Sequence, residues 1–422
     1  MLASTIGLGA AAQPAAQPAA PAAAASSAQG KLPDWSDYLE QLKPIGDRML
    51  ALTQHPDDPQ QRQETWRTLM GWLAQGFIDH VYDDPDYPEI TTPFNLALNL
   101  AAPNPDYIYQ GAPISGGGVY RIRGFRGTNR FVEVSIAPGS WQLDVVRPNV
   151  GDYDLNELHF GPDGAFDVIL SAERPKGYAG DWWRLDPSVG KWGRLGIRQA
   201  SYDWVHERDA VITIERLDVP PTRPRLTAEE LSARMSAMAM WVEKGSEIWW
   251  KRVEEIRAQG VINRVQPHSW AHMGGAKGQI YDEGMYRLAD DEALVLSAPV
   301  PKTCRYWSFM IGDDQFDTID WMNHQSSLNG YQAHVDKDGV FRTVISLKDP
   351  GAANWLDTGG NREGIIQVRW NNCDSAPTPT AQVVKLADLR HVLPPDTAFV
   401  TPQARDAALR ERRYGYQLRR KW

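Results

Sequence analysis

Polar side chains that could do chemistry are densest between positions 311 and 330. This stretch holds four aspartates and four further hydrogen-bonding residues, namely Asp313, Asp314, Asp317, Asp320, Asn323, His324, Gln325 and Asn329. Such a group could coordinate Ca²⁺ through oxygen atoms, or supply a general acid and a general base. The spacing of an EF-hand loop is absent, so the calcium interpretation has little support.

Two residues of this stretch, Asp320 and His324, are our candidate catalytic residues. A histidine oriented by a carboxylate can act as a general base near neutral pH, and the two residues are close together on a predicted strand or turn. The alternative interpretation is a solvated acidic loop that carries a surface histidine.

Metal and cofactor motifs have little support elsewhere. His268 and His272 have the spacing of two ligands on one helical face, but Gly274 and Gly275 would soon end a helix and no third ligand is obvious nearby. The turn at 115–118 lacks the Lys-Ser/Thr pair of a phosphate loop. The chain contains neither a Gly-x-Ser-x-Gly elbow nor a dinucleotide fingerprint. We therefore expect no metal and no cofactor.

Tryptophan is unusually frequent, with 17 copies against 10 phenylalanines. Its broad apolar face and single donor suit a pocket for an apolar ring or a sugar, although these side chains could equally fill a large core. We expect Tyr306 and Trp355 to form apolar contacts with a ligand and Asn329 a polar one. Arg369, which ends a predicted strand, could bind a carboxylate or sulfate, whereas its counterpart Arg198 favours an inherited structural ion pair instead.

The chain repeats itself at an offset of 175 residues. Segment 130–136 aligns with 305–311, and 159–166 aligns with 334–341, including the turn pairs Asp163-Gly164 and Asp338-Gly339. The second segment then lacks a few residues of a connecting loop, after which 195–198 aligns with 366–369. An unbroken offset with matched turn residues predicts a duplication.

The repeated unit has the pattern of β structure. Short runs rich in β-branched and aromatic residues predict strands at 119–122, 131–136, 165–170, 193–198 and 210–216. Helical periodicity predicts helices over 60–81 and 227–257, the second opened by a capping box of Thr227 and Glu230. We predict a mostly β (α+β) fold of two similar jelly-roll or β-sandwich units, each preceded by a long helix.

The net charge of −9 gives no reason to expect a nucleic-acid partner. The sequence contains no run of about 18 apolar residues, so we expect no membrane-spanning helix. Residues 1–30 lack charge and are rich in Ala and Pro, which predicts disorder. They also lack the basic start of a secretory signal, so the localisation stays open between cytoplasm and, for a truncated signal, periplasm.

The two cysteines, Cys304 and Cys373, could form one bridge, but we expect free buried thiols. The basic segment 404–422 is expected to be a solvated helix packed on the acidic body, with a membrane-surface or nucleic-acid role as the alternative.

The second copy resembles the bacterial domain of unknown function family 1214. The motifs that support this are Tyr306-Trp307, Asn323-x-x-Ser326-x-Leu328-Asn329-Gly330, Asp338-Gly339, Asn354-Trp355-Leu356 and Arg369-Trp370. The resemblance extends from about Asn99 to the C-terminus and departs at His324, where many relatives have Arg. It implies a β-sandwich fold and no established reaction.

The upstream segment is similar to one often found before that domain and in the related 1254 family. Its motifs are Asn104-Pro105-Asp106-x-x-Tyr109 and the following Tyr120-Arg121-Ile122-Arg123-Gly124. Asn104, Asp106 and Tyr109 are therefore candidate ligand-binding residues, although Asn and Asp around Pro commonly form turns.

These observations predict six regions: a disordered tail at 1–30, a helical region at 31–94, a first β unit at 95–220, a linking helix at 221–260, a second β unit at 261–400 and a basic helix at 401–422. We expect a cleft built mainly by the second unit and roofed by residues 104–109. It would bind a small apolar-ring or glycan-like ligand. Two alternatives remain for its function. The protein could be an enzyme with cofactor-independent acid/base chemistry (a lyase, hydratase or hydrolase), or a non-catalytic binding or assembly module. A homo-oligomer is also possible.

Overall fold

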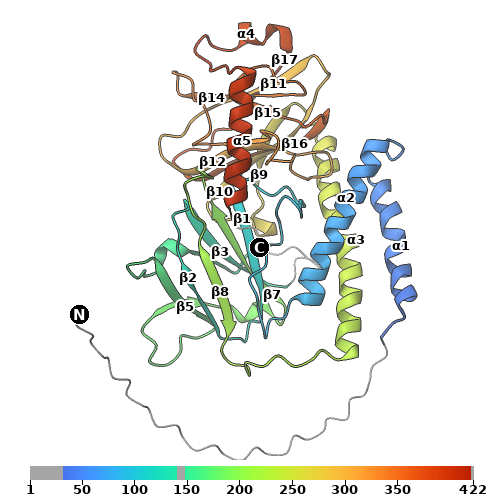
Figure 1. The fold of residues 1–422 in the computed structure, drawn as a ribbon, viewed down its shortest axis with the longest axis vertical. Helices are drawn as coiled ribbons and strands as arrows, with labels where there is room; N and C mark the ends of the chain where they lie inside the picture. The colour runs from blue at the N-terminus through green and yellow to red at the C-terminus, as the bar shows by residue number, and fades with distance from the viewer. Residues whose placement is uncertain (1–31, 140–147, 420–422) are drawn as a thin grey trace, which may run out of the picture.

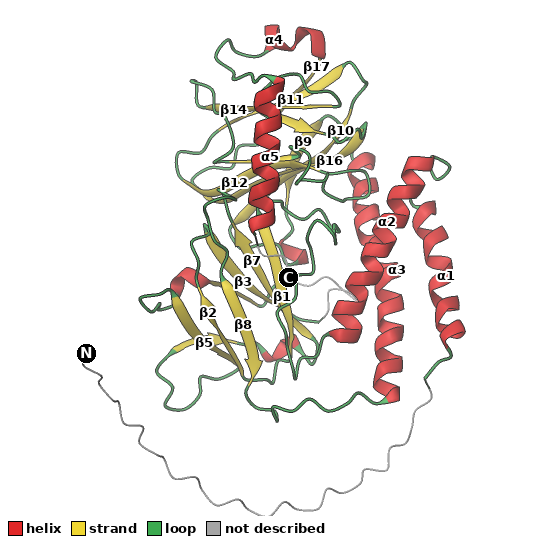
Figure 2. Ribbon diagram, in the orientation of Figure 1, coloured by secondary structure: helices red, strands yellow, loops and turns green. Residues whose placement is uncertain are grey.

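The computed structural model describes residues 32–139 and 148–419. Two β units follow one another along the long axis of the molecule, and three long helices run beside them on one side (Figures 1 and 2). The tail predicted at residues 1–30 lies outside the described residues. Within these ranges, no helix combines the length and the apolar character needed to cross a bilayer.

The first β unit consists of two four-stranded sheets, with strand orders β1-β7-β3-β4 and β6-β5-β2-β8. Its strands are β1 (Tyr107–Ile114), β2 (Tyr120–Phe125), β3 (Phe131–Ala137), β4 (Gly151–Asp154), β5 (Ala165–Ser171), β6 (Asp181–Arg184), β7 (Gly193–Ala200) and β8 (Val211–Arg216). Alternate side chains of both sheets, among them Ile122, Val134, Val168 and Ile197, form one buried core. The unit is therefore a β-sandwich.

The second unit has sheets of order β10-β16-β12-β13 and β15-β14-β11-β17. Its strands are β9 (Arg264–His268), β10 (Gln279–Arg287), β11 (Glu292–Pro299), β12 (Cys304–Ile311), β13 (Ser327–Asn329), β14 (Val340–Ser346), β15 (Trp355–Asp357), β16 (Glu363–Cys373) and β17 (Thr380–Lys385). Leu296, Phe309, Phe341 and Val368 lie in a core between these two sheets.

The two units share both strand order and register. In the first, Ala200 on β7 pairs with Tyr107 on β1 and with Phe131 on β3. In the second, Asn371 on β16 pairs with Gln279 on β10 and Tyr306 on β12 in the same way. Each unit also contains one parallel pair, β5 with β6 and β14 with β15. The predicted fold class is confirmed, whereas duplication, the jelly-roll description and the six-region division stay predictions.

The helices are α1 (Trp35–Ala51), α2 (Pro59–Gly76), α3 (Ala228–Ala258), α4 (Leu389–Val392) and α5 (Pro402–Leu418). The helix predicted over 60–81 continues past Gly76 as a π-helical turn, Phe77–Tyr82. Thr227 and Glu230 form the predicted capping box at the start of α3.

Helices α2 and α3 pack through a reciprocal contact. The indole rings of Trp72 and Trp241 meet edge to face, with centroids 4.9 Å apart. A Cβ at Gly76 would lie 2.8 Å from the Trp241 ring, and a Cβ at Gly245 would lie 2.7 Å from the Trp72 ring. Each tryptophan therefore needs the glycine of the other helix, and in both helices the glycine follows the tryptophan by four positions.

Helix α5 ties the second unit to the first through buried arginines. Arg405 donates to the carbonyl oxygens of Ala352 and Ala353, and Arg412 donates to that of Trp321. Just after the helix, Arg419 pairs with Asp209 of the first unit at 3.0 Å. Three of the basic residues of this segment, Arg405, Arg412 and Arg419, thus serve in internal contacts.

The expectation of free thiols is wrong, because Cys304 and Cys373 form a disulfide. The two residues lie directly opposite each other on β12 and β16. Strand pairing between segments far apart in the chain brings them together, which their spacing in the sequence could not reveal.

Candidate ligand-binding site

The acidic stretch 313–317 holds helix α2 against the second unit. Thr68 Oγ1 donates to Asp317 Oδ2 at 2.8 Å, and Gln61 Nε2 donates to Asp314 at 3.0 Å. Burial raises the pKa of Asp313 to about 7 and that of Asp317 well above its ordinary value; the charge of Asp314 raises the first further, and the charge of Asp313 raises the second. These aspartates form a helix-docking surface rather than a solvated loop.

The predicted side-chain pair of Asp320 and His324 does not form. Asp320 Oδ1 accepts hydrogen bonds from the backbone N–H groups of Met322 and Asn323, both at 3.1 Å, and so closes a turn. The partner of His324 is Asp357, whose Oδ2 lies 2.7 Å from Nδ1 of the imidazole. This contact raises the pKa of His324. The correction follows from topology, because β15 places residue 357 beside the turn.

Four predicted ligand-binding residues do come together, but in a packed interface. Asp106 Oδ1 accepts from Trp204 Nε1 at 2.8 Å and Asn329 Nδ2 at 2.7 Å, and its Oδ2 accepts from the Tyr306 hydroxyl at 2.7 Å. Asn104 Nδ2 donates to the Tyr306 oxygen at 2.8 Å. All four residues are buried and satisfy one another, so the expected roof over a cleft is instead a joint between the units.

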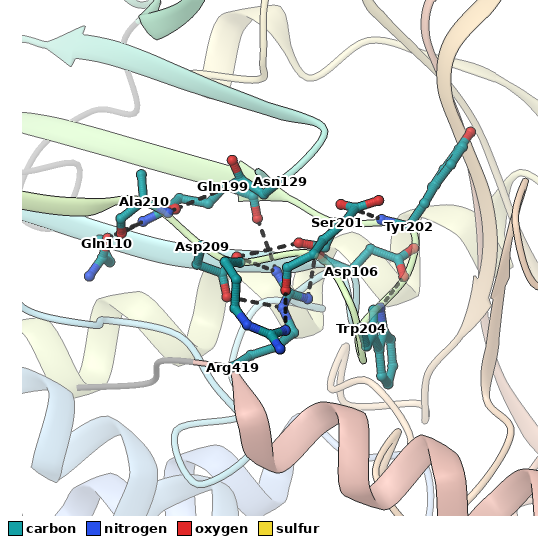
Figure 3. A network of polar contacts seen from close by, with 12 residues as sticks. Asp106, Gln110, Asn129, Gln199, Ser201, Tyr202, Trp204, Asp209, Ala210 and Arg419 are labelled. Carbon is teal, nitrogen blue, oxygen red and sulfur yellow. Dashed lines mark hydrogen bonds and ion pairs between the residues drawn. The ribbon is translucent and has the colours of Figure 1, made fainter. Parts of the chain in front are cut away.

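Figure 3 shows how this joint continues into the first unit. Arg419 donates to the carbonyl oxygen of Asp106 at 2.8 Å and pairs with Asp209. Beyond Asp209, Gln199 bridges Gln110 and Asn129. Burial raises the pKa of the Asp106 carboxyl, against the lowering effect of its three donors.

Trp355 also belongs to the packed interior. Its indole nitrogen donates to the carbonyl oxygen of Ser346 at 3.1 Å, and the guanidinium of Arg405 lies 5.4 Å from the ring centre. We therefore do not place it in a ligand cavity. His268 and His272 lie on β9 and on the turn Ala271–Met273 rather than on one helix, and no group of three metal-ligating side chains occurs in the described ranges.

A cavity of about 200 Å³ lies where the two units meet α3 and the loop after β9. Both units contribute strands to its wall, β1, β3 and β7 from the first and β10 and β16 from the second. Of the predicted ligand-binding residues, Tyr109 and Arg369 line it. Asp320 and His324 are not among its lining residues.

Three aromatic side chains form one wall of the cavity. The rings of Trp249 and Phe316 are stacked, with centroids 5.1 Å apart, and Trp270 lies 5.6 Å from Trp249 and 5.9 Å from Phe316. Because these residues come from α3 and two separate loops, the wall exists only in the folded chain. Such a wall presents flat apolar faces to a ring of similar size.

Strained backbone is concentrated at the same place. Ala101, Ala102 and Phe316 line the cavity, and all three have positive φ angles of 63°, 46° and 69°. The Ala102 N–H donates to the Phe316 carbonyl oxygen at 2.7 Å, so the two strained turns support each other. Non-glycine residues hold such angles at a cost, and this strain is often found at functional sites.

Three arginines line the cavity, and two of them, Arg198 and Arg369, come from equivalent strands. Arg369 is only 5% exposed, and it donates to Gln367 Oε1 at 2.6 Å. Arg198 donates to the Gly274 carbonyl oxygen at 2.9 Å. The inherited ion pair expected from their equivalence is absent, because neither arginine forms an ion pair among the described residues.

Sequence reasoning missed most of this site. Trp249 lies among apolar residues at helical spacing, a pattern typical of core positions, and Trp270 and Phe316 lie in loops without a recognisable motif. The one available signal was that Arg198 and Arg369 occupy equivalent positions in the aligned segments. Matched cations in both copies mark the cavity, whereas the polar residues unique to the second copy mostly hold the fold together.

The fold and site together define a class: β proteins of two similar sandwich units, with an aromatic- and arginine-lined cavity where the units meet. Residues 282–371, from β10 to β16, match the family described as protein of unknown function (DUF1214). The match begins in the second unit, so the resemblance of the upstream segment to the 1254 family stays a prediction. None of the curated proteins compared with this chain is significantly similar to it.

A solved structure of an uncharacterized protein from Burkholderia cenocepacia is 30% identical, with a TM-score of 0.78, over 84% of this chain and 97% of that one. The chain belongs to the same family as that protein. The VPA0106 protein from Vibrio parahaemolyticus is 11% identical, with a TM-score of 0.44, over 83% of this chain and 99% of that one.

Proposed function

We propose that this protein binds a small ring-containing organic molecule in the cavity between its β units. The observation that supports this best is the aromatic wall of Trp249, Phe316 and Trp270, which is built from separate elements and includes strained backbone at Phe316. A cavity of about 150 Å³ can hold benzene, so 200 Å³ accommodates one ring with a small polar substituent. A single sugar ring would also fit, but a longer glycan would not.

A filled-cavity variant tests the proposal. Single-ring compounds, both aromatic and sugar, are screened by saturation-transfer NMR, and the hits are titrated calorimetrically. Ala137 lines the cavity, and Ala137→Leu adds bulk there, which we expect to weaken binding about tenfold, or ~1.4 kcal/mol. The matched control, Ala179→Leu, makes the same change on the exposed surface of the first unit. Equal affinity of both variants for every hit would refute the assignment of the ligand to this cavity.

A second candidate function is cofactor-independent acid/base catalysis by His324. Asp357 contacts Nδ1 of the His324 imidazole. The side chain of His324 is 38% exposed, so its other nitrogen, Nε2, can take a proton from a substrate. Because His324 does not line the cavity, small esters, amides and hydroxy acids, rather than only the ring compounds that bind there, are incubated with the protein and followed by mass spectrometry. If His324 is catalytic, the wild-type protein converts at least one compound to a product, and the His324→Gln variant does not. Unchanged compounds would favour the binding module.

A further inference from the structure

Of the three arginines that line the cavity, Arg194 has carboxylate partners, whereas Arg198 and Arg369 form no ion pair with a described residue. Arg252 pairs with Glu283 at 2.6 Å, and Arg194 pairs with Asp79 at 2.9 Å. Arg198 and Arg369 are held by neutral groups, namely oxygens of Gly274, Ser135, Gln367 and Ala102 and the sulfur of Met310. A buried guanidinium without a counter-charge is costly, and an anion that enters the cavity would remove that cost.

Both arginines occupy the same position in their units and have the same neighbour. Arg198 pairs across β7 and β1 with Tyr109, and Arg369 pairs across β16 and β10 with Tyr281. All four residues line the cavity. Burial raises the pKa of Tyr109, and the positive charges of Arg369 and Arg198 both lower it, so the two cations act on one point of the wall.

The local charge balance sets how much negative charge the cavity can accept. Glu133 on β3 lies opposite Arg198 in the register, and its Oε1 accepts from Asn371 at 3.1 Å. Arg305 also lies 3.9 Å from Glu133, but it has its own partner in Asp154. With Asp79 assigned to Arg194 and Glu283 to Arg252, Arg198 and Arg369 share Glu133 as the remaining carboxyl group. The cavity therefore has an excess of about one positive charge even when Glu133 is ionised.

We infer that the ligand is a ring-bearing carboxylic acid in its ionised form, with the carboxylate at Arg198 and Arg369 and the ring against Trp249, Phe316 and Trp270. This inference rests on the proposed function and names its ligand class. One carboxylate balances the excess charge, whereas a phosphate monoester would bring nearly two negative charges close to Glu133. A carboxylate also suits the planar fork of a guanidinium.

Benzoate and benzamide provide a matched pair of probes, because they share a ring and nearly the same shape but differ in charge. We expect calorimetry to show that the full chain binds benzoate about tenfold more tightly than benzamide. Arg369→Gln should abolish this preference while benzamide still binds. Arg198→Gln, at a half-exposed position, provides the same test should the buried variant fail to fold. Arg264→Gln, an exposed residue on β9, is the control and should keep the preference.

The outcomes separate the two proposals. Equal affinity for benzoate and benzamide would overturn the carboxylate inference and leave the ring site intact. Binding of neither probe would overturn both, because the ring site would then lack its simplest ligand. A benzoate preference that survives in both arginine variants would place the anion elsewhere and also overturn the inference.

Discussion

At the scale of single residues, Asp106 shows how one carboxylate can join two domains. It is fully buried and accepts three hydrogen bonds, from Trp204 of the first unit and from Tyr306 and Asn329 of the second. Removing such an acceptor leaves several donors unpaired in the interior, which costs more than the bonds themselves contribute.

We predict that Asp106→Ala lowers the free energy of unfolding by about 3–5 kcal/mol. Chemical denaturation followed by circular dichroism measures the change. The control is Asp290→Ala, because the pair of Asp290 with Arg362 is exposed and should be worth less than about 1 kcal/mol. A loss at Asp106 no larger than at Asp290 would show that the joint contributes little.

The sequence predicted individual residues best where a motif was short and local. Asn104, Asp106, Tyr306 and Asn329 were selected on motif grounds and lie together. Their role was not predictable, because the same residue types form a binding site or a buried joint depending on what covers them. Asp357 was missed as the partner of His324, because strand pairing brings it there from 33 positions away.

At the scale of elements, the docking of α2 on the second unit depends on protonation. Asp313 and Asp317 are buried side by side, close to Asp314, Glu64 and Arg67. Burial raises the pKa of Asp313 from 3.8 to about 7, so the folded protein holds a proton there that the unfolded chain releases near pH 4. The contribution of Asp313 to stability is therefore fully present below pH 4 and is lost as the pH rises toward 7.

Asp313→Asn should flatten this dependence. The asparagine oxygen can still accept the backbone N–H groups of Gln315 and Asp317, as Oδ1 does at 2.9 Å, but it has no charge to bury. We expect the loss of thermal stability between pH 5 and pH 8 to be smaller in the variant than in the wild type. Parallel curves for the two proteins would show that Asp313 does not hold a proton in the folded state.

Strands with a regular pattern of β-branched and aromatic residues were predictable from the sequence, whereas a strand that directly follows a turn motif was not. The strands expected at 131–136, 165–170 and 193–198 are present as β3, β5 and β7. Strand β1 was missed because Asn104-Pro105-Asp106 was interpreted as a turn, and the strand begins directly after it at Tyr107.

At the scale of the whole molecule, the cavity is a product of assembly. Its wall combines residues from 93 to 369, so no window of sequence contains it. The matched register of the units explains why equivalent arginines face the same space: two similar sheets meet with the same strands inward. The similarity of the two segments was visible in the sequence, but the angle at which the two units meet was not.

The most direct test of the account is a crystal structure of the protein soaked with 4-bromobenzoate, in which anomalous scattering locates the bromine. The account predicts one strong bromine peak beside Trp249, Phe316 and Trp270, with the carboxylate toward Arg198 and Arg369. An empty cavity at saturating ligand, or a bromine peak only elsewhere on the molecule, would contradict it.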